Sequence, residues 1–138
     1  MVDADIALLR NVYDRYAEGD VAPLFEHLAP DVEWVSCSQS PALAAFSGAF
    51  HGPEGVQRYF EGLTREWTIT KHELQSMTDD GDQVVTRNLV QAVNKTTGNP
   101  VNVTTEHRWV LHDGKIQRFE ERCPDEALLE AACRPGGP

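Results

Sequence analysis

The stretch from Glu106 to Arg122, EHRWVLHDGKIQRFEER, decides the fold, because it reads as two short β-strands that reverse direction at Asp113-Gly114. An Asp-Gly pair between alternating segments is a strong hairpin signal, since both central residues of a type I′ turn need a positive φ. With a regular two-residue turn, Glu106 lies directly opposite Glu121. Like charges at facing positions destabilise a sheet, so this pair needs either a functional reason or neutralising neighbours.

Strict alternation across the turn divides the hairpin into two faces. The first face carries Glu106, Arg108, Val110, Gln117, Phe119, Glu121 and Cys123. The second face pairs His107 with Glu120, Trp109 with Arg118, and Leu111 with Ile116, which suits an outer sheet surface or a dimer interface. A bulged three-residue loop at the turn would instead place the two glutamates on different faces.

A neighbouring strand adds basic side chains to the first face. An even-length turn at residues 96–99 places Arg87, Leu89 and Gln91 on the same face as Glu106. We therefore expect this face to line a cleft in which Arg87 or Arg108 partly neutralises the glutamates. A purely structural ion-pair network is the alternative for each arginine.

The rest of the chain predicts an α+β fold. Apolar stripes predict helices over residues 3–18, 21–28 and 52–67 and a short one over 124–132. Alternation predicts strands over 30–36, 68–77, 83–94, 101–112 and 115–123, with a loop over 37–52. Four strands in meander order indicate a curved antiparallel sheet with the helices on one side. We expect one domain over residues 1–133 and a flexible tail over 134–138.

Composition excludes several classes of function. The 138-residue chain has a formal net charge of −10 and no run of Lys or Arg, which argues against nucleic acid and anionic membranes as partners. No signal peptide or membrane span is visible, and three cysteines without CxxC spacing suit a reducing compartment, so we expect a cytoplasmic protein. The five histidines (His27, His51, His72, His107 and His112) lack metal-ligand spacing, and nucleotide-binding motifs are absent, so we predict no metal and no cofactor.

Three segments carry a resemblance to a known family. The runs YAEGDVAPLFEHLAPDVEW (16–34), GAFHGPEGVQRYFEGL (48–63) and HRWVLHDGKIQRFEE (107–121) resemble the SnoaL-like branch of the nuclear transport factor 2-like (NTF2-like) superfamily. The resemblance implies a cone-shaped curved sheet around N-terminal helices, a deep apolar pocket that binds a small hydrophobic ligand, and a homodimer formed through the outer sheet faces. It implies no single activity, because fold does not define function.

The same resemblance proposes site residues. Positions matching the base, tyrosine and acid of ketosteroid isomerase are Ser36, Val12 and Glu106, so only the acid is kept. Limonene epoxide hydrolase-like members match at Arg87 and Glu121, but Leu89 stands in place of their first aspartate. Polyketide cyclase-like members need chiefly a sheet carboxylate, which Glu121 supplies.

These arguments give one set of candidate residues. We predict Glu121, Glu106 and Arg87 as catalytic, with one of the two glutamates titrating above its ordinary range. Tyr16 is favoured over Tyr13 as an internal hydrogen-bond donor, and the thiols are expected to be inert. The predicted pocket residues are Val12, Tyr16, Trp34, Ser36, Phe60, Leu89, Arg108, Phe119 and Cys123.

Two functions from different classes follow. The first is a cofactor-independent isomerase, cyclase or hydrolase that uses Glu121 as general acid/base on an apolar carbonyl or epoxide compound. The second is a non-catalytic dimeric module that binds a hydrophobic ligand or a protein partner, and the departures at Ser36, Val12 and Leu89 favour it.

Overall fold

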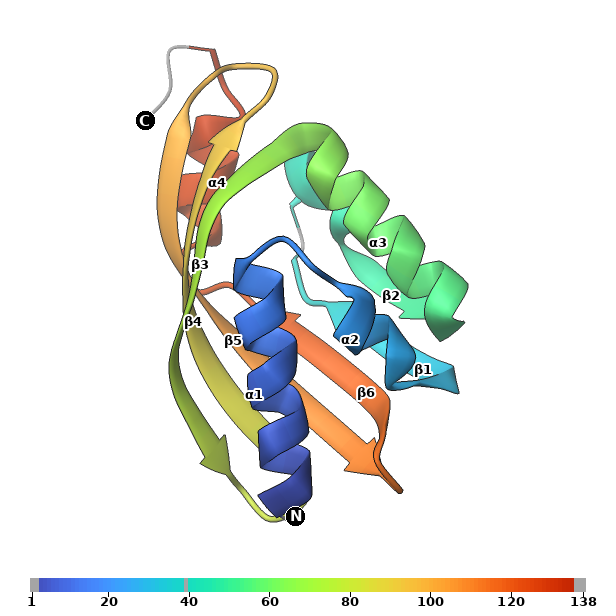
Figure 1. Ribbon diagram of the computed structural model, residues 1–138. Coiled ribbons are helices and arrows are strands. Elements are labelled where there is room, and N and C mark those ends of the chain that lie inside the picture. Colours follow the sequence, from blue (N-terminus) through green and yellow to red (C-terminus); the bar gives the residue numbers. More distant parts are fainter. Residues whose placement is uncertain (1–2, 39, 136–138) are drawn as a thin grey trace.

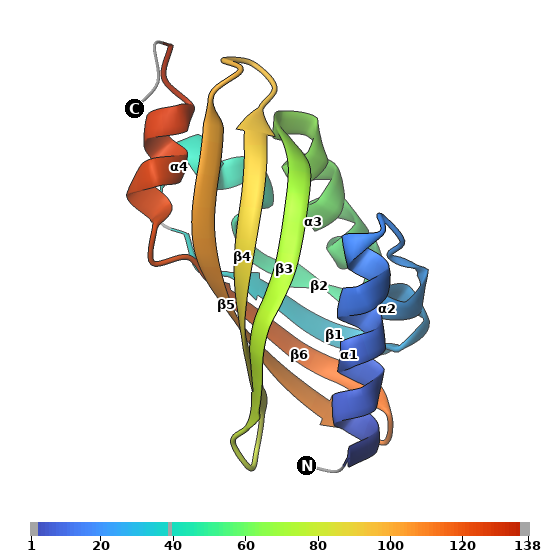
Figure 2. The same cartoon turned by 60° about the vertical axis from the view of Figure 1, so that its left-hand side comes forward.

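A strongly curved sheet of six strands is the scaffold of the molecule, and α1 lies across its inner face (Figures 1 and 2). The computed structural model describes residues 3–38 and 40–135, so the last three residues of the predicted tail lie outside it. The elements are α1 (Asp3–Ala17), α2 (Ala22–Glu26), β1 (Leu28–Ser36), the 3-10 helix η1 (Pro41–Phe46), β2 (Gly48–His51), α3 (Gly52–Glu66), β3 (Trp67–Asp79), β4 (Val84–Asn94), β5 (Pro100–His112), β6 (Lys115–Arg122) and α4 (Glu126–Ala132). The predicted α+β class is confirmed.

The sheet differs from the prediction in two respects. Its order is β2-β1-β6-β5-β4-β3, and β1 pairs with β6 in parallel, so the sheet is mixed rather than wholly antiparallel. The segment predicted as a loop over 37–52 contains η1 and the short edge strand β2. Both features depend on pairing with β1 and packing against α3, which local sequence periodicity does not report.

The hairpin of β5 and β6 turns at Asp113 and Gly114, and both have the predicted positive φ, at 51° and 73°. The prediction that Glu106 faces Glu121 was nevertheless wrong. Next to the turn Leu111 pairs with Ile116, but beyond it Val110 pairs with Arg118, which leaves Gln117 as an extra residue. This β-bulge shifts the register by one, as bulges do.

The shift reassigns the pairs of the hairpin. Glu121 now lies opposite His107, Glu106 lies opposite Arg122, and Trp109 lies opposite Phe119. The predicted pairs of His107 with Glu120 and of Trp109 with Arg118 are therefore wrong too. A one-residue slip moves every side chain beyond it to the other face, and the separation of the glutamates follows from that.

The inner face of the sheet is set by β5. Its burial alternates along the strand, with Val101, Val103, Thr105, His107, Trp109 and Leu111 all buried. The surface that we assigned to a dimer interface is therefore the interior: Trp109 is 2 % exposed and Ile116 is fully buried. The reason is the same register shift. The prediction placed Phe119 and Glu121 on one face with Glu106, but the bulge places them on one face with Trp109 and His107.

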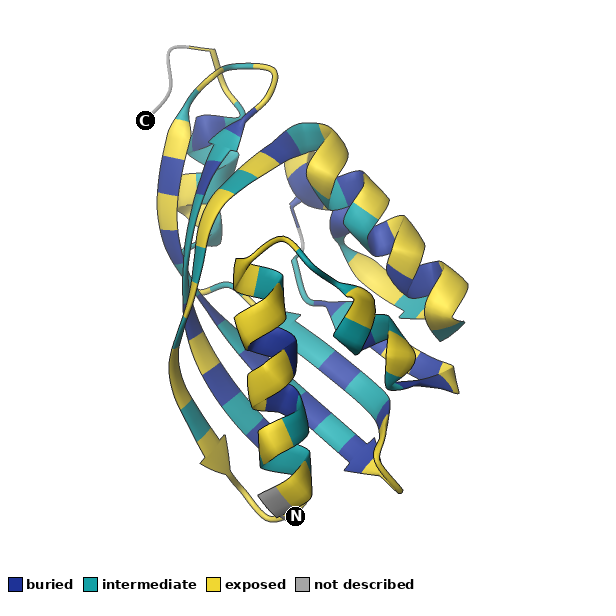
Figure 3. Ribbon diagram, viewed as in Figure 1, coloured by how far each residue is buried: buried dark blue, intermediate teal, exposed yellow. Residues whose placement is uncertain are grey.

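The helices pack by their apolar faces. Figure 3 shows exposed positions of α1 and α3 on the sides turned away from the sheet. In α3, Val56 and Tyr59 are buried, and Gly62 approaches η1 so closely that a Cβ atom built there would lie 2.0 Å from the carbonyl oxygen of Ala45. The close approach of α3 to η1 therefore requires a glycine at position 62. None of the helices in the described ranges is long and apolar enough to span a membrane.

Candidate functional site

A cavity of about 420 Å³ lies between α1, α3 and the inner face of the sheet. Helix α1 contributes Val12, Tyr13 and Tyr16, and α3 contributes Tyr59, Phe60 and Leu63. The sheet supplies the opposite wall, including Trp34, Trp109 and Phe119, and α4 borders the cavity with Glu126 and Leu129. Apolar and aromatic side chains dominate this lining, as they do in small-molecule pockets.

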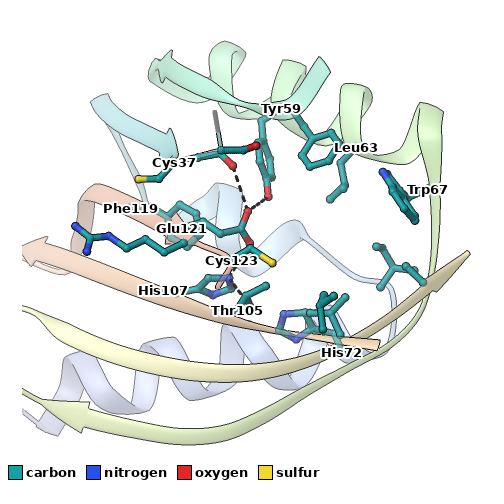
Figure 4. Close-up of a pocket in the computed structure, with 18 of the residues that line it drawn as sticks. Cys37, Tyr59, Leu63, Trp67, His72, Thr105, His107, Phe119, Glu121 and Cys123 are labelled. Carbon is teal, nitrogen blue, oxygen red and sulfur yellow. Dashed lines mark hydrogen bonds and ion pairs between the residues drawn. The ribbon is translucent and has the colours of Figure 1, made fainter. Parts of the chain in front are cut away.

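Glu121 is a carboxylate on the sheet wall of this aromatic cavity. Glu121 Oε2 lies 2.9 Å from His107 Nε2, and Glu121 Oε1 accepts a 2.8 Å hydrogen bond from the hydroxyl of Tyr59 (Figure 4). The hydroxyl of Ser36 lies 3.5 Å from the same Oε1, because β1 and β6 pair Ser36 with Glu121. The Glu121 side chain is 18 % exposed, compared with 8 % for His107, so the carboxylate is the more accessible member of the pair.

Behind His107 lies a buried polar network. The hydroxyl of Tyr13 is 2.6 Å from His107 Nδ1 and 2.6 Å from Thr86 Oγ1, and it accepts a 2.8 Å hydrogen bond from Trp109 Nε1. The amide nitrogen of Asn88 lies 3.2 Å from Thr86 Oγ1 and 3.3 Å from His107 Nδ1. The network therefore joins α1 to β4 and β5.

Hydrogen bonds engage both ring nitrogens of His107. Nε2–H donates to Glu121, and Nδ1 pairs with the Tyr13 hydroxyl, which also pairs with Thr86. Both ring nitrogens are then engaged, so His107 has no free lone pair for a ligand. Oε1 of Glu121 accepts from both Tyr59 and Ser36, whereas Oε2 keeps a second lone pair, and the carboxylate is the group that can act on a bound molecule.

The electrostatics of Glu121 differ from the prediction. Burial raises the pKa of Glu121, but the hydrogen bond and charge interaction with His107 and the hydrogen bond from Tyr59 outweigh burial, so this pKa is lowered. The predicted raised pKa required Glu106 beside Glu121, and the bulge separates them. Glu121 is consequently a carboxylate at neutral pH.

Aromatic rings pack against one another in the lining of the cavity. Trp34 stacks on Phe119 at a centroid distance of 3.8 Å, and Trp109 meets Phe119 edge-on at 4.6 Å. Tyr16 contacts His72 at 4.9 Å, but its hydroxyl has no hydrogen-bond partner within residues 3–38 and 40–135. The internal tyrosine donors are Tyr13 and Tyr59, so the preference for Tyr16 over Tyr13 was wrong: Tyr13, and not Tyr16, reaches the polar groups of β4 and β5.

The structure brings most of the predicted pocket residues together. Val12, Tyr16, Trp34, Ser36, Phe60, Phe119, Cys123 and the catalytic candidate Glu121 all line the cavity. Burial raises the pKa of the Cys123 thiol to about 12, which disfavours the reactive thiolate. Cys37 also lies at the cavity, and both cysteines are free thiols.

Four predicted residues lie on the other face of the sheet. Glu106, Arg87, Arg108 and Leu89 do not line the cavity as the described residues define it. Arg108 Nε is 3.1 Å from Glu106, and Arg87 Nη2 is 3.9 Å from Glu106, so the arginines neutralise Glu106 on the outer face. The prediction correctly kept Arg87, Leu89 and Glu106 on one face, but it chose the wrong face because of the bulge.

Sequence reasoning missed His107, Tyr13, Tyr59 and His72 as site residues. One signal was available for His107: four of the five Val, Leu and Trp residues of β5 (Val101, Val103, Trp109 and Leu111, but not Val110) occupy odd positions, and His107 shares that parity. Ile116 and Phe119 gave a second signal, because two apolar residues three apart within one strand require a bulge if both are to face the core. No group of three or more His, Cys, Asp or Glu side chains within the described ranges is arranged to hold a metal ion.

The curved sheet and its covering helices define the class of NTF2-like folds. The chain belongs within that class to the family of the SnoaL-like domain, whose model matches residues 9–119. The predicted family is confirmed. No curated protein sequence matches the chain at a significant level.

Solved structures agree with this assignment. An NTF2-like protein from Burkholderia thailandensis is 25 % identical with a TM-score of 0.83, and the match covers 98 % of this chain and 100 % of that protein. TerC, co-crystallised with polyporic acid, is 20 % identical with a TM-score of 0.77 over 93 % of this chain and 97 % of its own. A candidate SnoaL-like polyketide cyclase from Mesorhizobium loti is 19 % identical with a TM-score of 0.71 over 88 % of this chain and 99 % of its own.

Proposed function

We propose that this protein is a cofactor-independent enzyme that removes a proton from the carbon next to the carbonyl group of a small, largely apolar compound. Glu121 is the base. The observation that carries the proposal is a carboxylate with a free lone pair on Oε2 inside an aromatic cavity, oriented by His107 and Tyr59. A base held within reach of the reacting carbon is the first requirement of general acid/base catalysis.

The chemical step balances without a further reactant. The C–H bond breaks, its proton passes to a Glu121 oxygen, and its electron pair moves through the adjacent carbon to the carbonyl oxygen, which gives an enolate. Return of the proton to another carbon completes an isomerisation. In a cyclisation, the enolate carbon attacks a second carbonyl carbon of the same molecule, and the resulting alkoxide takes the proton from Glu121. The names of fold neighbours fit both outcomes, since one is a candidate polyketide cyclase and another a candidate isomerase.

His107 and Tyr13 are positioning residues in this proposal. The Nε2–H of His107 holds one oxygen of Glu121, and Tyr13 fixes the imidazole through Nδ1. A base whose rotamer is locked by such partners loses little entropy when the substrate binds.

A test uses deuterium exchange into β-tetralone, a bicyclic apolar ketone with an acidic C–H between the ring and the carbonyl. We expect the wild type to incorporate deuterium from D₂O faster than buffer does, and Glu121→Gln to lower that rate about 100-fold or more. The matched control is Glu106→Gln, which removes the neighbouring carboxylate on the outer face and leaves exchange unchanged. Equal exchange by wild type and Glu121→Gln, with both variants folded, contradicts the proposal.

One observation favours a second candidate, a non-catalytic module that binds a hydrophobic ligand. The lowered pKa of Glu121 makes its carboxylate a weaker base than an ordinary glutamate. Saturable binding of β-tetralone without any exchange above the buffer rate would support the module. The same measurement therefore separates the two functions.

A further inference from the structure

His72 is another polar side chain of the cavity, and the proposed proton transfer does not use it. It projects from β3 into the cavity lining between α1 and the sheet. Its ring meets Tyr16 edge-on at a centroid distance of 4.9 Å and stacks near Tyr13 at 5.8 Å and His107 at 6.0 Å. Figure 4 shows His72 on the same wall as His107 and Thr105, opposite Tyr59 and Leu63.

The ring nitrogens of His72 differ from those of His107 in their partners. Both nitrogens of His107 are hydrogen-bonded. Neither nitrogen of His72 has a hydrogen-bond partner among residues 3–38 and 40–135. A half-buried donor without a partner loses its hydration when a ligand fills the cavity, so a ligand that leaves it unpaired binds less well.

The His72 ring is uncharged at neutral pH. Burial, helped by the nearby His107, lowers its pKa to about 4. It therefore presents one N–H donor and one acceptor lone pair. A neutral imidazole can polarise a carbonyl group through its N–H.

The charges around the cavity restrict the ligand. The charged lining residues are Glu121, Glu126 and Arg122, and Arg122 pairs with Glu120 at 2.8 Å. Within the described lining no unpaired cation faces the interior to neutralise an anionic ligand, and Glu121 repels one. An uncharged ketone can contact both Glu121 and His72 without this repulsion.

We propose that His72 donates a hydrogen bond from its ring N–H to the carbonyl oxygen of an uncharged apolar ketone whose acidic C–H lies at Glu121. The placement of the C–H at Glu121 rests on the proposed function, whereas the hydrogen bond from His72 to the carbonyl oxygen does not. In the enolate the oxygen carries the negative charge, so a donor fixed at that place stabilises the charge as it develops. His72 is then a catalytic residue and selects for ketones over hydrocarbons of equal size.

A surface groove supplies the competing explanation. His72 also borders a groove between α1 and β3 that is lined by Arg10, Asp14, Lys71 and Glu73. Water in this groove would satisfy the His72 nitrogens from outside, and the ring would then only pack against Tyr13 and Tyr16. The two explanations predict different ligand preferences.

The test compares binding of β-tetralone with binding of tetralin, which has the same ring system without the carbonyl oxygen. We expect the wild type to bind the ketone about tenfold or more tightly than the hydrocarbon. His72→Phe keeps an aromatic ring and is expected to abolish that preference, whereas His72→Gln supplies an amide N–H and restores part of it. His112→Phe is the matched control, because His112 lies on the surface outside the cavity lining, and it keeps the full preference.

A second readout tests direct contact. The imidazole ¹⁵N resonances of His72 are expected to shift on addition of β-tetralone but not of tetralin. Retention of the full ketone preference in His72→Phe overturns the proposal and assigns the His72 nitrogens to groove water. Loss of the preference in His72→Phe without deuterium exchange in the wild type keeps ketone recognition and refutes only the proposed proton abstraction.

Discussion

Removal of the Tyr13 hydroxyl tests the buried network most directly. In Tyr13→Phe the ring stays, but contacts at 2.6 Å to Thr86, 2.6 Å to His107 and 2.8 Å to Trp109 are lost. Thr86 and His107 keep Asn88 as a partner, at 3.2 and 3.3 Å. The indole N–H of Trp109, on a side chain that is 2 % exposed, is left unpaired.

The magnitude follows from these partners. An orphaned buried donor costs about 1–3 kcal/mol, and weakening of the other two bonds adds roughly 1 kcal/mol, so we expect a loss of about 2–4 kcal/mol in the free energy of unfolding. For a domain of this size that lowers Tm by roughly 6–14 °C. Urea unfolding and thermal melts followed by circular dichroism measure both quantities.

Tyr16→Phe is the matched control, because it deletes the same hydroxyl one turn further along α1. Burial raises the pKa of Tyr16 to about 12, but its hydroxyl has no hydrogen-bond partner in the described ranges. We expect a change within about 0.5 kcal/mol. If Tyr13→Phe and Tyr16→Phe proved equally stable, the network would not hold α1 to the sheet, and the reasoning would be refuted.

Three further predictions concern pH, packing and assembly. The pKa of His72 is lowered from 6.5 to about 4, so between these pH values the unfolded chain binds more protons than the folded chain. The free energy of unfolding should therefore fall as the pH drops from about 6.5 to about 4. Urea titrations should show a smaller fall in His72→Phe, and an equal fall would contradict the lowered pKa of His72. Gly62→Ala places a Cβ atom 2.0 Å from the Ala45 carbonyl oxygen and should cost about 1–3 kcal/mol, and an unchanged Tm would show that η1 yields freely. We still expect a homodimer, now through the outer sheet face that carries Glu106 and Leu89, and sedimentation velocity at micromolar concentration would refute it by showing only monomer.

Local chemistry made much of the fold predictable. Asp113-Gly114 located the turn because few residue pairs accept two positive φ values. The apolar stripe with Val56 and Tyr59 identified α3, which spans Gly52–Glu66, within one residue of the prediction at its end. Strand ends were close for the same reason, since turn residues mark them.

The site was less predictable, because it depends on register and long-range pairing. Glu121 was identified by its match to the family, although the facing residue is His107 rather than Glu106. Parity counted outward from the turn failed at Gln117, where one extra residue is accommodated. Tyr59 reaches Glu121 from α3, 62 positions away in sequence, and no local pattern encodes that distance.

The bulge at Gln117 also affects how relatives should be aligned. A chain that lacks this one residue would form a regular hairpin in which every position from Arg118 onward keeps its present partner on β5. The residue equivalent to Glu121 would then lie one position nearer the turn in the sequence but would still face His107. Counting from the turn would equate it with Glu120, whose side chain pairs with Arg118 and Arg122. The correct equivalence across such insertions and deletions is the position opposite His107, whatever its number.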